Sequence, residues 1–241
     1  QLEKEKTQTQ NPMQTINCTQ PTSKFFSRKA NRKQLSRVQT PPSPDWRTDA
    51  DHHRHSSAQW QLHTVKIKRK FVLLAMHMET RFAMVFVGIK QNDLHDFTHS
   101  FVERWLNEMI RLGMQLGFLS EAELPLVFER FVQQHLQFEL VQRSDRSVQG
   151  HMNQNLAHLE DLAAEVGALP ANEHEATGFD MWVNGHLRSI GGCPGYFYPD
   201  EEMLKYWWAH FGPTQRTTSE QITKACQQRR RIQRDIPIVK G

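Results

Sequence analysis

Two apolar runs decide the fold: FVLLAM at residues 71–76 and RFAMVFV at residues 81–87, separated by HMET at residues 77–80. Each run has the length of a β-strand, and a short connection between two such runs predicts an antiparallel hairpin. Apolar and polar residues alternate at 60–65, ahead of a polar turn at 66–70, which adds a strand before the hairpin. The sequence therefore predicts an antiparallel meander of three strands.

Three later segments have apolar residues three and four positions apart, which is the spacing of an amphipathic helix. They span residues 92–113, 120–135 and 145–167, and either Asp145 or Ser147 is expected to cap the third helix by accepting from its first N–H groups. The apolar stripes of these helices are expected to cover the sheet. We therefore predict an α+β fold, in which a small antiparallel meander sheet packs against about three amphipathic helices.

The remaining segments differ from this core in composition and set the predicted domain organisation. Residues 1–12 are predicted to be a flexible extension, and residues 13–19 an edge strand. Residues 20–58 are rich in Pro, His and other polar residues, and they are predicted to be a disordered insert because they have too few apolar side chains to offset the entropy of ordering. Residues 59–212 form the single predicted α+β domain. Residues 213–241 are predicted to be a flexible basic tail, in which residues 219–234 could form a helix.

Charge is distributed unevenly along the 241 residues, although the formal net charge is only +4. Residues 1–61 contain 10 Lys and Arg against 5 Asp and Glu, and residues 205–241 contain 8 against 2, whereas residues 62–204 contain 12 against 19. An acidic centre between basic ends argues against a fold that is itself a nucleic-acid platform, and it places any affinity for phosphate in the two ends.

Membrane proteins and several kinds of site are excluded by the composition. No apolar run approaches the roughly 18 residues of a membrane-spanning helix, so no membrane contact is expected. The 3 cysteines have no CxxC spacing, which favours reduced thiols in a cytoplasmic protein over a disulfide framework or a zinc site. Cys193, on a glycine-rich turn, is better explained as a small turn residue than as a nucleophile.

A histidine-rich stretch has the residue types of a metal site but not its setting. His52-His53-Arg54-His55 lies in the predicted insert, where no rigid element would hold the ligands in place. Adventitious binding is the better interpretation of such a tract. Neither a metal nor a cofactor is predicted.

One compact motif resembles that of a known family. Arg146-Ser147-Val148-x-Gly150-x-Met152-Asn153 is similar to the motif of the uncharacterised bacterial domain-of-unknown-function family 6933. Weaker similarities, among them Met13–Thr19 and Phe86–Lys90, extend the resemblance over about residues 13–204. The polar insert and the basic tail depart from the family pattern. The resemblance implies a small bacterial α+β domain of unassigned activity, from which no catalytic residue carries over.

A polar cluster at the start of the third predicted helix is the main candidate for a ligand site. It comprises Arg143, Asp145, Arg146, His151 and Asn153. Free N–H groups at a helix N-terminus and nearby guanidinium groups suit a phosphate or a carboxylate. The same residue types also occur where Asp145 only caps the helix and pairs with an arginine, so both roles stay open.

The C-terminal tail is the second candidate, because it concentrates cationic side chains. They are Lys224, Arg229, Arg230, Arg231 and Arg234. Such a run neutralises nucleic-acid phosphates without base specificity, and it serves equally well to keep a protein soluble.

Two functional classes follow, and the sequence does not decide whether the protein is an enzyme. The first is a cytoplasmic bacterial binding or regulatory module whose basic extensions contact nucleic acid. The second is a small, toxin-like hydrolase of phosphodiester or nucleotide substrates, in which arginines stabilise charge and His151 transfers a proton. Side chains that converge on an open pocket would favour the hydrolase, whereas side chains that cap and pair would favour the binding module.

Overall fold

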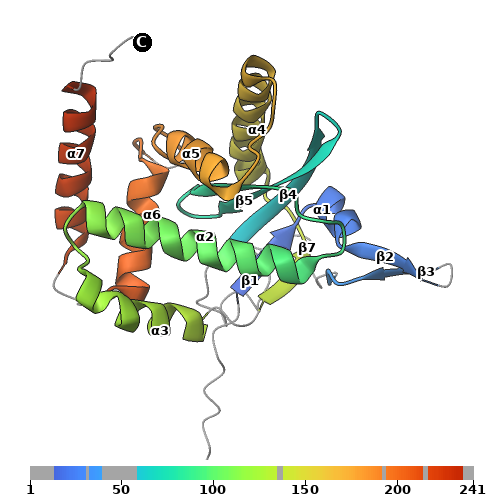
Figure 1. The fold of residues 1–241 in the computed structure, drawn as a ribbon, viewed down its shortest axis with the longest axis horizontal. Helices are drawn as coiled ribbons and strands as arrows, with labels where there is room; N and C mark the ends of the chain where they lie inside the picture. The colour runs from blue at the N-terminus through green and yellow to red at the C-terminus, as the bar shows by residue number, and fades with distance from the viewer. Residues whose placement is uncertain are drawn as a thin grey trace, which may run out of the picture.

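The computed structural model describes six stretches of the chain and places a five-stranded sheet at their centre (Figure 1). The described residues are 14–30, 33–39, 59–134, 138–191, 194–213 and 217–235. The strands lie in the order β6-β5-β4-β1-β7 and span Gln14–Cys18 (β1), Gln59–Ile67 (β4), Lys70–His77 (β5), Ala83–Val87 (β6) and Phe138–Gln142 (β7). The predicted flexible extension, residues 1–12, lies outside the described residues.

The predicted meander is the antiparallel half of this sheet. β4 pairs with β5, and β5 pairs with β6, both in antiparallel register. The turn between β4 and β5 places Lys68 and Arg69 in the left-handed region, with φ of 46° and 67°. An all-antiparallel sheet is wrong, however, because β1 pairs in parallel with both β4 and β7. The fold is α+β with a mixed sheet.

β1 is an interior strand and not the edge strand that its alternation predicted. It lies between β4 and β7, and all five of its residues are buried. The neighbouring strand β4 accepts from one of its polar side chains: Asn17 donates to the Gln59 side chain at 3.1 Å and to the Trp60 carbonyl at 3.3 Å. In a strand that is buried on both faces, polar and apolar residues do not mark a solvent face and a core face. The sequence pattern therefore does not reveal that β1 lies inside the sheet.

The first part of the predicted disordered insert is ordered. It contains α1 (Gln20–Phe25) and an antiparallel hairpin of β2 (Ser27–Ala30) and β3 (Lys33–Ser36). The rings of Phe25 and Phe26 are 2% and 1% exposed, and they anchor α1 to the core. Two aromatic side chains supply apolar area that an average over the whole segment conceals. Residues 40–58 lie outside the described residues.

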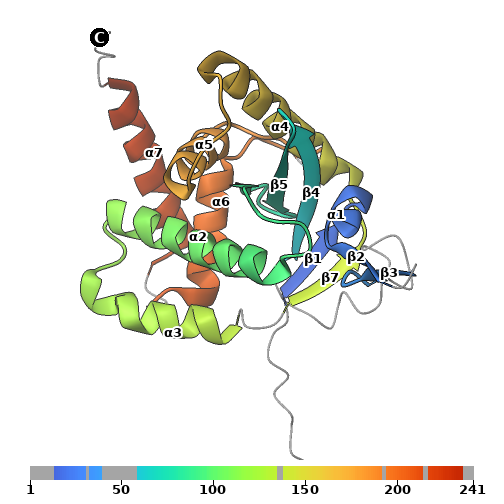
Figure 2. The same cartoon turned by 45° about the vertical axis from the view of Figure 1, so that its right-hand side comes forward.

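Helices cover both faces of the sheet, which gives three layers (Figure 2). One face is covered by α1, α2 (Leu94–Gln115), α3 (Leu124–Gln134) and α6 (Pro199–Phe211). Their core is aromatic, and Trp60, Trp105 and Trp207 are each 0% exposed. The opposite face is covered by α4 (Arg146–Val166) and α5 (Glu173–Asn184), which pack on aliphatic residues of β5 and β6.

The described residues contain seven α-helices rather than about three. α2, α3 and α4 correspond to the three predicted helices, and α7 (Ser219–Asp235) lies within the predicted basic tail. The apolar pattern does not reveal α5 and α6, because buried polar residues interrupt their apolar faces: Asp180 and Asn184 in α5, and Asp200 and Glu201 in α6. No helix within these described stretches is both long enough and apolar enough to span a membrane.

The polar residues of α5 close the free edge of the sheet. Asn184 accepts a hydrogen bond from the Ala83 N–H at 2.8 Å and donates one to the Ala83 carbonyl at 2.7 Å. Asp180 accepts from the Val85 N–H at 2.9 Å. Two side chains of a helix thereby take the place of a further strand beside β6, which protects the edge from pairing with another chain.

Candidate functional site

Asp145 is the N-cap of α4, as one of the two interpretations of the predicted cluster requires. Its Oδ1 accepts a hydrogen bond from the Val148 N–H at 3.0 Å. Its own N–H donates to Oε1 of the buried Gln61 at 2.6 Å, which ties the start of α4 to β4. Gly167 ends the helix in the left-handed conformation, with φ of 85°.

The other members of the predicted cluster do not converge on one point. Arg143 is 8% exposed, and its N–H donates to the Cys18 carbonyl at 2.9 Å, which continues the pairing of β7 with β1. Arg146 begins α4 with an exposed side chain. Asn153 is also exposed, and its Oδ1 accepts from a glutamine one turn earlier at 2.9 Å. His151, by contrast, lies among further basic residues.

Two arginines that belong to no sequence motif flank His151. Arg81, in the turn between β5 and β6, is 3% exposed and donates to Ser147 Oγ at 3.1 Å. Arg188, between α5 and α6, is 8% exposed, and its backbone pairs with that of Phe197. We refer to Arg81, His151 and Arg188 as the basic cluster. Only the fold brings these three residues together, because they come from distant parts of the chain.

Arg188 is held by neutral partners. Its Nη1 donates to Gln154 Oε1 at 2.7 Å, and its Nη2 donates to Asn155 Oδ1. Within the described part of the chain it forms no ion pair with a carboxylate. Burial lowers the pKa of Arg188, which is the direction expected for a cation without a neighbouring anion.

His151 is the imidazole of the basic cluster, and its surroundings lower its pKa. It is half-buried, and its Nδ1 has no hydrogen-bond partner among the described residues. Burial lowers the pKa of His151 most, the charges of Arg81 and Arg188 lower it further, and a hydrogen bond with the Ser189 backbone opposes them. The imidazole is therefore neutral at pH 7, and an anion beside it would raise its pKa.

Two of the predicted nucleic-acid-binding arginines form ion pairs within the molecule. α7 packs along α6, and Arg229 Nη2 lies 2.6 Å from Asp200 Oδ2. Arg230 pairs with Asp200 and, at 2.8 Å, with Glu201, and its guanidinium lies 3.6 Å from the ring centroid of Tyr198. We refer to Asp200, Glu201, Arg229 and Arg230 as the α6–α7 clamp.

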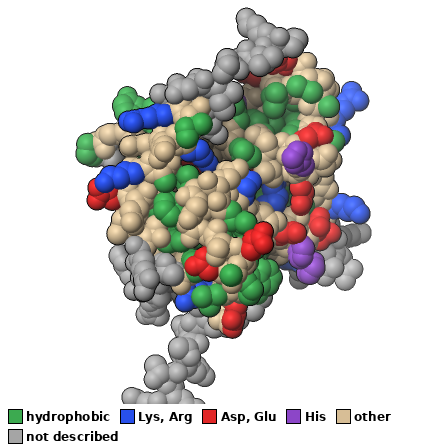
Figure 3. Space-filling model, turned by 60° about the vertical axis from the view of Figure 1, so that its left-hand side comes forward, with side chains coloured by type: hydrophobic (Ala, Val, Ile, Leu, Met, Phe, Trp, Pro, Cys, Tyr) green, Lys and Arg blue, Asp and Glu red, His purple; other side chains and the backbone are tan. Residues whose placement is uncertain are grey.

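The other predicted cations of α7 are more exposed. Nζ of Lys224 lies 2.8 Å from Oε1 of Glu220 on the helix surface, and Arg231 is exposed. The side chain of Arg234 lies outside the described residues. On the face of the molecule in Figure 3, acidic, basic and apolar side chains are interspersed, and no broad field of positive charge is visible.

The remaining metal and thiol candidates lie partly outside the described residues. His52–His55 and Cys193 lie outside the described residues. Among the residues that are described, no group of three or more His, Cys, Asp or Glu could hold a metal ion. Cys18 and Cys226 are buried free cysteines, and burial raises the pKa of both thiols, that of Cys226 to about 11. Both are therefore protonated and unreactive at neutral pH.

Comparison with known proteins gives a family and no activity. No curated protein matches the chain significantly. The family described as Domain of unknown function (DUF6933) matches residues 15–202, which include nearly all of the sheet and the basic cluster but end before α7. Because this match covers most of the chain, the protein belongs to the DUF6933 family, as the motif at Arg146–Asn153 predicted.

Proposed function

We propose that the protein is a binding module for a small anion, which the basic cluster holds beside the start of α4. The observation that carries this proposal is Arg188, a buried guanidinium whose hydrogen bonds all go to neutral amides. Removing a charge from water without a counter-charge is costly. A phosphate or carboxylate would supply that counter-charge, and the planar guanidinium matches both groups in geometry.

The groups nearer the start of α4 suit the same ligand. Ser147 lies in the first turn of α4, where the helix dipole and free N–H groups favour negative charge. Its hydroxyl already binds the guanidinium of Arg81. His151 lies one turn further along α4, and it would gain a proton as the anion binds, because negative charge raises its pKa. Anion binding is therefore expected to be coupled to proton uptake by His151.

Thermal unfolding in sodium phosphate tests the proposal, with sodium chloride of equal ionic strength as the reference. The wild-type protein should be stabilised by phosphate, by about 2.7 kcal/mol at a concentration 100-fold above Kd. Arg188→Met should lose this stabilisation, whereas Arg231→Gln, which removes an exposed arginine of α7, should keep it. The proposal is wrong if Arg188→Met is stabilised as strongly as the wild type, or if neither phosphate nor a nucleotide stabilises the wild type.

The hydrolase has less support from the geometry. It requires Asp145, Arg146 and His151 to act on one substrate, whereas Asp145 caps α4 and Arg146 is exposed. Turnover of bis(p-nitrophenyl) phosphate that disappears in His151→Asn would support the hydrolase instead of a binding module.

Contact with nucleic acid through the ends of the chain remains a prediction. In the described part of α7, Lys224 and Arg231 support it, while Arg229 and Arg230 are occupied by carboxylates. Fluorescence anisotropy of a labelled oligonucleotide at two salt concentrations tests it, because affinity from phosphate contacts falls steeply with salt. We also propose a bacterial cytoplasmic location, which the buried free thiols and the family resemblance support.

A further inference from the structure

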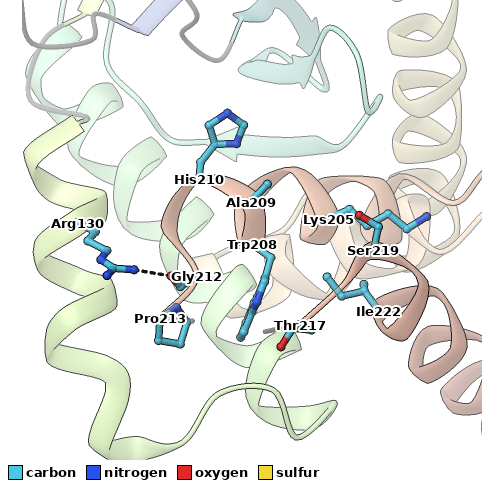
Figure 4. Close-up of a pocket in the computed structure, with 10 residues that line it drawn as sticks. All are labelled: Arg130, Lys205, Trp208, Ala209, His210, Gly212, Pro213, Thr217, Ser219 and Ile222. Carbon is cyan, nitrogen blue, oxygen red and sulfur yellow. Dashed lines mark hydrogen bonds between the residues drawn. The ribbon is translucent and has the colours of Figure 1, made fainter. Parts of the chain in front are cut away.

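Two of the cavities in the described chain differ in what surrounds them. The first, of about 610 Å³, lies between α3, the end of α6 and the start of α7, and Arg130 there donates to the Gly212 carbonyl at 2.6 Å (Figure 4). Residues 214–216, which connect α6 to α7, lie outside the described residues, so only part of its surroundings is described. The second, of about 260 Å³, is lined by the end of β6, by α2 and by the start of α5.

The second cavity lies at the edge of the sheet. Phe86 and Val87 both line it, although Phe86 packs in the aromatic core on one face and Val87 against the aliphatic core on the other. Successive residues of a strand point to opposite faces, so a space that borders both lies beside the strand rather than above or below it. β6 is the last strand of the sheet at this edge, and α5 packs along it.

α5 contacts this edge through residues spaced four apart, and the third of them is not polar. The side chains of Asn184 and Asp180 bind outward backbone groups of two alternate residues of β6. Alternate residues of an antiparallel strand turn their backbone groups to the same side, so Val87 is the next residue that faces the edge. One turn before Asp180, α5 presents Ala176, which lines the cavity. The cavity therefore takes the place of a third polar side chain.

The backbone of Val87 has no hydrogen bonds at this edge. Val87 is half-buried, and its N–H and C=O groups have no hydrogen-bond partner among the described residues. Gly88 follows in the left-handed region, with φ of 93°, and the strand ends there. One backbone donor and one backbone acceptor therefore lie side by side at the cavity, in the arrangement that Asn184 binds at Ala83.

Two carboxylates without a counter-charge also line the cavity. Asp96 lies in the first turn of α2 and Glu173 in the first turn of α5, and both are exposed. Neither forms an ion pair within the part of the chain that the structure describes. The cation in the lining, Arg104, is buried and already binds Asp180. The accessible charge is therefore negative, which favours a ligand with a positive group.

We propose that this cavity binds a small primary carboxamide that carries a positive charge, such as an amino-acid amide. Its oxygen would accept from the Val87 N–H and its NH2 group would donate to the Val87 carbonyl, as the Asn184 side chain does at Ala83. A carboxylate lacks the donor and would be repelled by Asp96 and Glu173, and a guanidinium lacks the acceptor. No residue of the basic cluster lines this cavity, so the site is independent of the proposed function.

Titration with glycinamide at neutral pH tests the proposal in protein labelled with 15N-valine. The Val87 amide resonance, identified by its loss in Val87→Ile, should shift saturably as its N–H gains an acceptor. Acetamide keeps the amide without the charge, and ethylammonium keeps the charge without the amide, so each should bind at least about fivefold more weakly. Equal binding of acetamide or of ethylammonium, or a Val87 resonance that glycinamide does not move, would overturn the proposal.

A substitution in α5 locates the ligand. Ala176→Asn supplies a carboxamide from the protein at the place of the ligand, so it should weaken glycinamide at least about fivefold. Ala164→Asn makes the same change at an exposed position of α4 and should bind as the wild type does. Unchanged binding by a folded Ala176→Asn variant would place the ligand elsewhere and contradict the proposal.

A second variant decides the question if Ala176→Asn does not fold, because it changes only exposed residues. Asp96→Asn combined with Glu173→Gln removes both carboxylates and should weaken glycinamide at least about fivefold. Glu160→Gln combined with Asp161→Asn removes two exposed carboxylates of α4 and should have no such effect. Equal affinities of the two double variants would show that the carboxylates at the cavity do not select the ligand, and would overturn the proposal.

Discussion

The arginines of the basic cluster and those of the α6–α7 clamp have opposite kinds of partner. In the clamp, burial lowers the pKa of Arg230, but Asp200 and Glu201 outweigh it and raise the pKa above its usual value. In the basic cluster, burial lowers the pKa of Arg188 and its hydrogen-bond partners are neutral amides. A buried arginine with carboxylates holds the fold together, whereas one without them is available to a ligand. The comparison thus separates a structural site from a candidate binding site.

The largest loss of stability is expected at Arg104, a third arginine, which is buried together with its carboxylate partner. Arg104 donates to Asp180 and to the Val85 carbonyl, and the side chains of Arg104 and Asp180 are 5% and 1% exposed. Arg104→Met leaves buried Asp180 without its cation, and burial already raises the pKa of Asp180 to about 8; the variant should reduce the free energy of unfolding by about 3–5 kcal/mol. Urea denaturation measures this loss.

A double variant distinguishes the lost ion pair from lost packing at Arg104. Asp180→Asn removes the charge and keeps an oxygen that can accept from the Val85 N–H. The combination of Arg104→Met with Asp180→Asn should therefore recover part of the stability lost in Arg104→Met. No recovery would show that packing against Phe86, 4.6 Å from the guanidinium, accounts for the whole effect.

The next largest effect is expected at the clamp. Arg230→Met leaves Asp200 and Glu201 with one arginine fewer, and it should cost about 2 kcal/mol, less than at Arg104 because the clamp is closer to solvent. Hydrogen exchange should show the loss as faster exchange confined to α7. Lys224→Gln, which breaks an exposed pair with Glu220, should cost no more than about 0.5 kcal/mol. Equal exchange rates of α7 in both variants would mean that the clamp does not hold the helix.

His77 shows a third way to bury a basic group, which is to keep it neutral. Burial, together with Arg81 and His210, lowers the pKa of His77 to about 3, and the Thr80 N–H donates to its Nδ1 at 3.3 Å. The unfolded chain takes up this proton near the ordinary pKa of 6.5 and the folded protein does not. This contribution to stability is therefore complete above pH 6.5 and is lost as the pH falls toward 3, by up to about 1.4 kcal/mol for each pH unit.

The pH dependence of unfolding in His77→Asn checks this assignment. The asparagine Oδ1 can still accept the Thr80 N–H, but it does not titrate. Urea denaturation between pH 7 and pH 5 should show a smaller loss of stability for the variant than for the wild type, with the remaining loss due to His151 and other titratable groups. Parallel pH profiles would show that His77 takes up its proton equally in the folded and unfolded protein, and that its pKa is not lowered by folding.

Local patterns in the sequence predict the antiparallel half of the fold and the start of α4. The apolar runs at 71–76 and 81–87 form paired strands, and Asp145 caps α4 because capping depends on residues within one helical turn. The parallel pairing of β1 depends on a partner, β7, more than 100 residues away, and no local pattern encodes it. No local pattern reveals Arg81 and Arg188 either, because each is a single charged residue whose neighbours come from elsewhere in the chain.

Two arginines of the predicted nucleic-acid surface are neutralised within the molecule for a related reason. Arg229 and Arg230 look like free cations in the sequence, because Asp200 and Glu201, which neutralise them, lie in a helix that the apolar pattern does not reveal. A run of cations in a sequence therefore predicts a charged surface only when the positions of the acidic residues are also known. Membership of the family, in contrast, depends on order along the chain and could be predicted from one motif.

Among the three arginines compared, the smallest change in stability is expected at Arg188, and this result decides between a structural and a ligand-binding role. Arg188→Met removes a charge that lacks a counter-charge, which favours the folded state, but it also leaves the buried Asn155 Oδ1 without its donor. These effects oppose each other, so without phosphate the free energy of unfolding should stay within about 1 kcal/mol of the wild type. Urea denaturation measures this beside Arg230→Met. A loss as large as that of Arg230→Met would make Arg188 a structural cation; a small loss, with phosphate stabilising only the wild type, would assign its charge to the ligand.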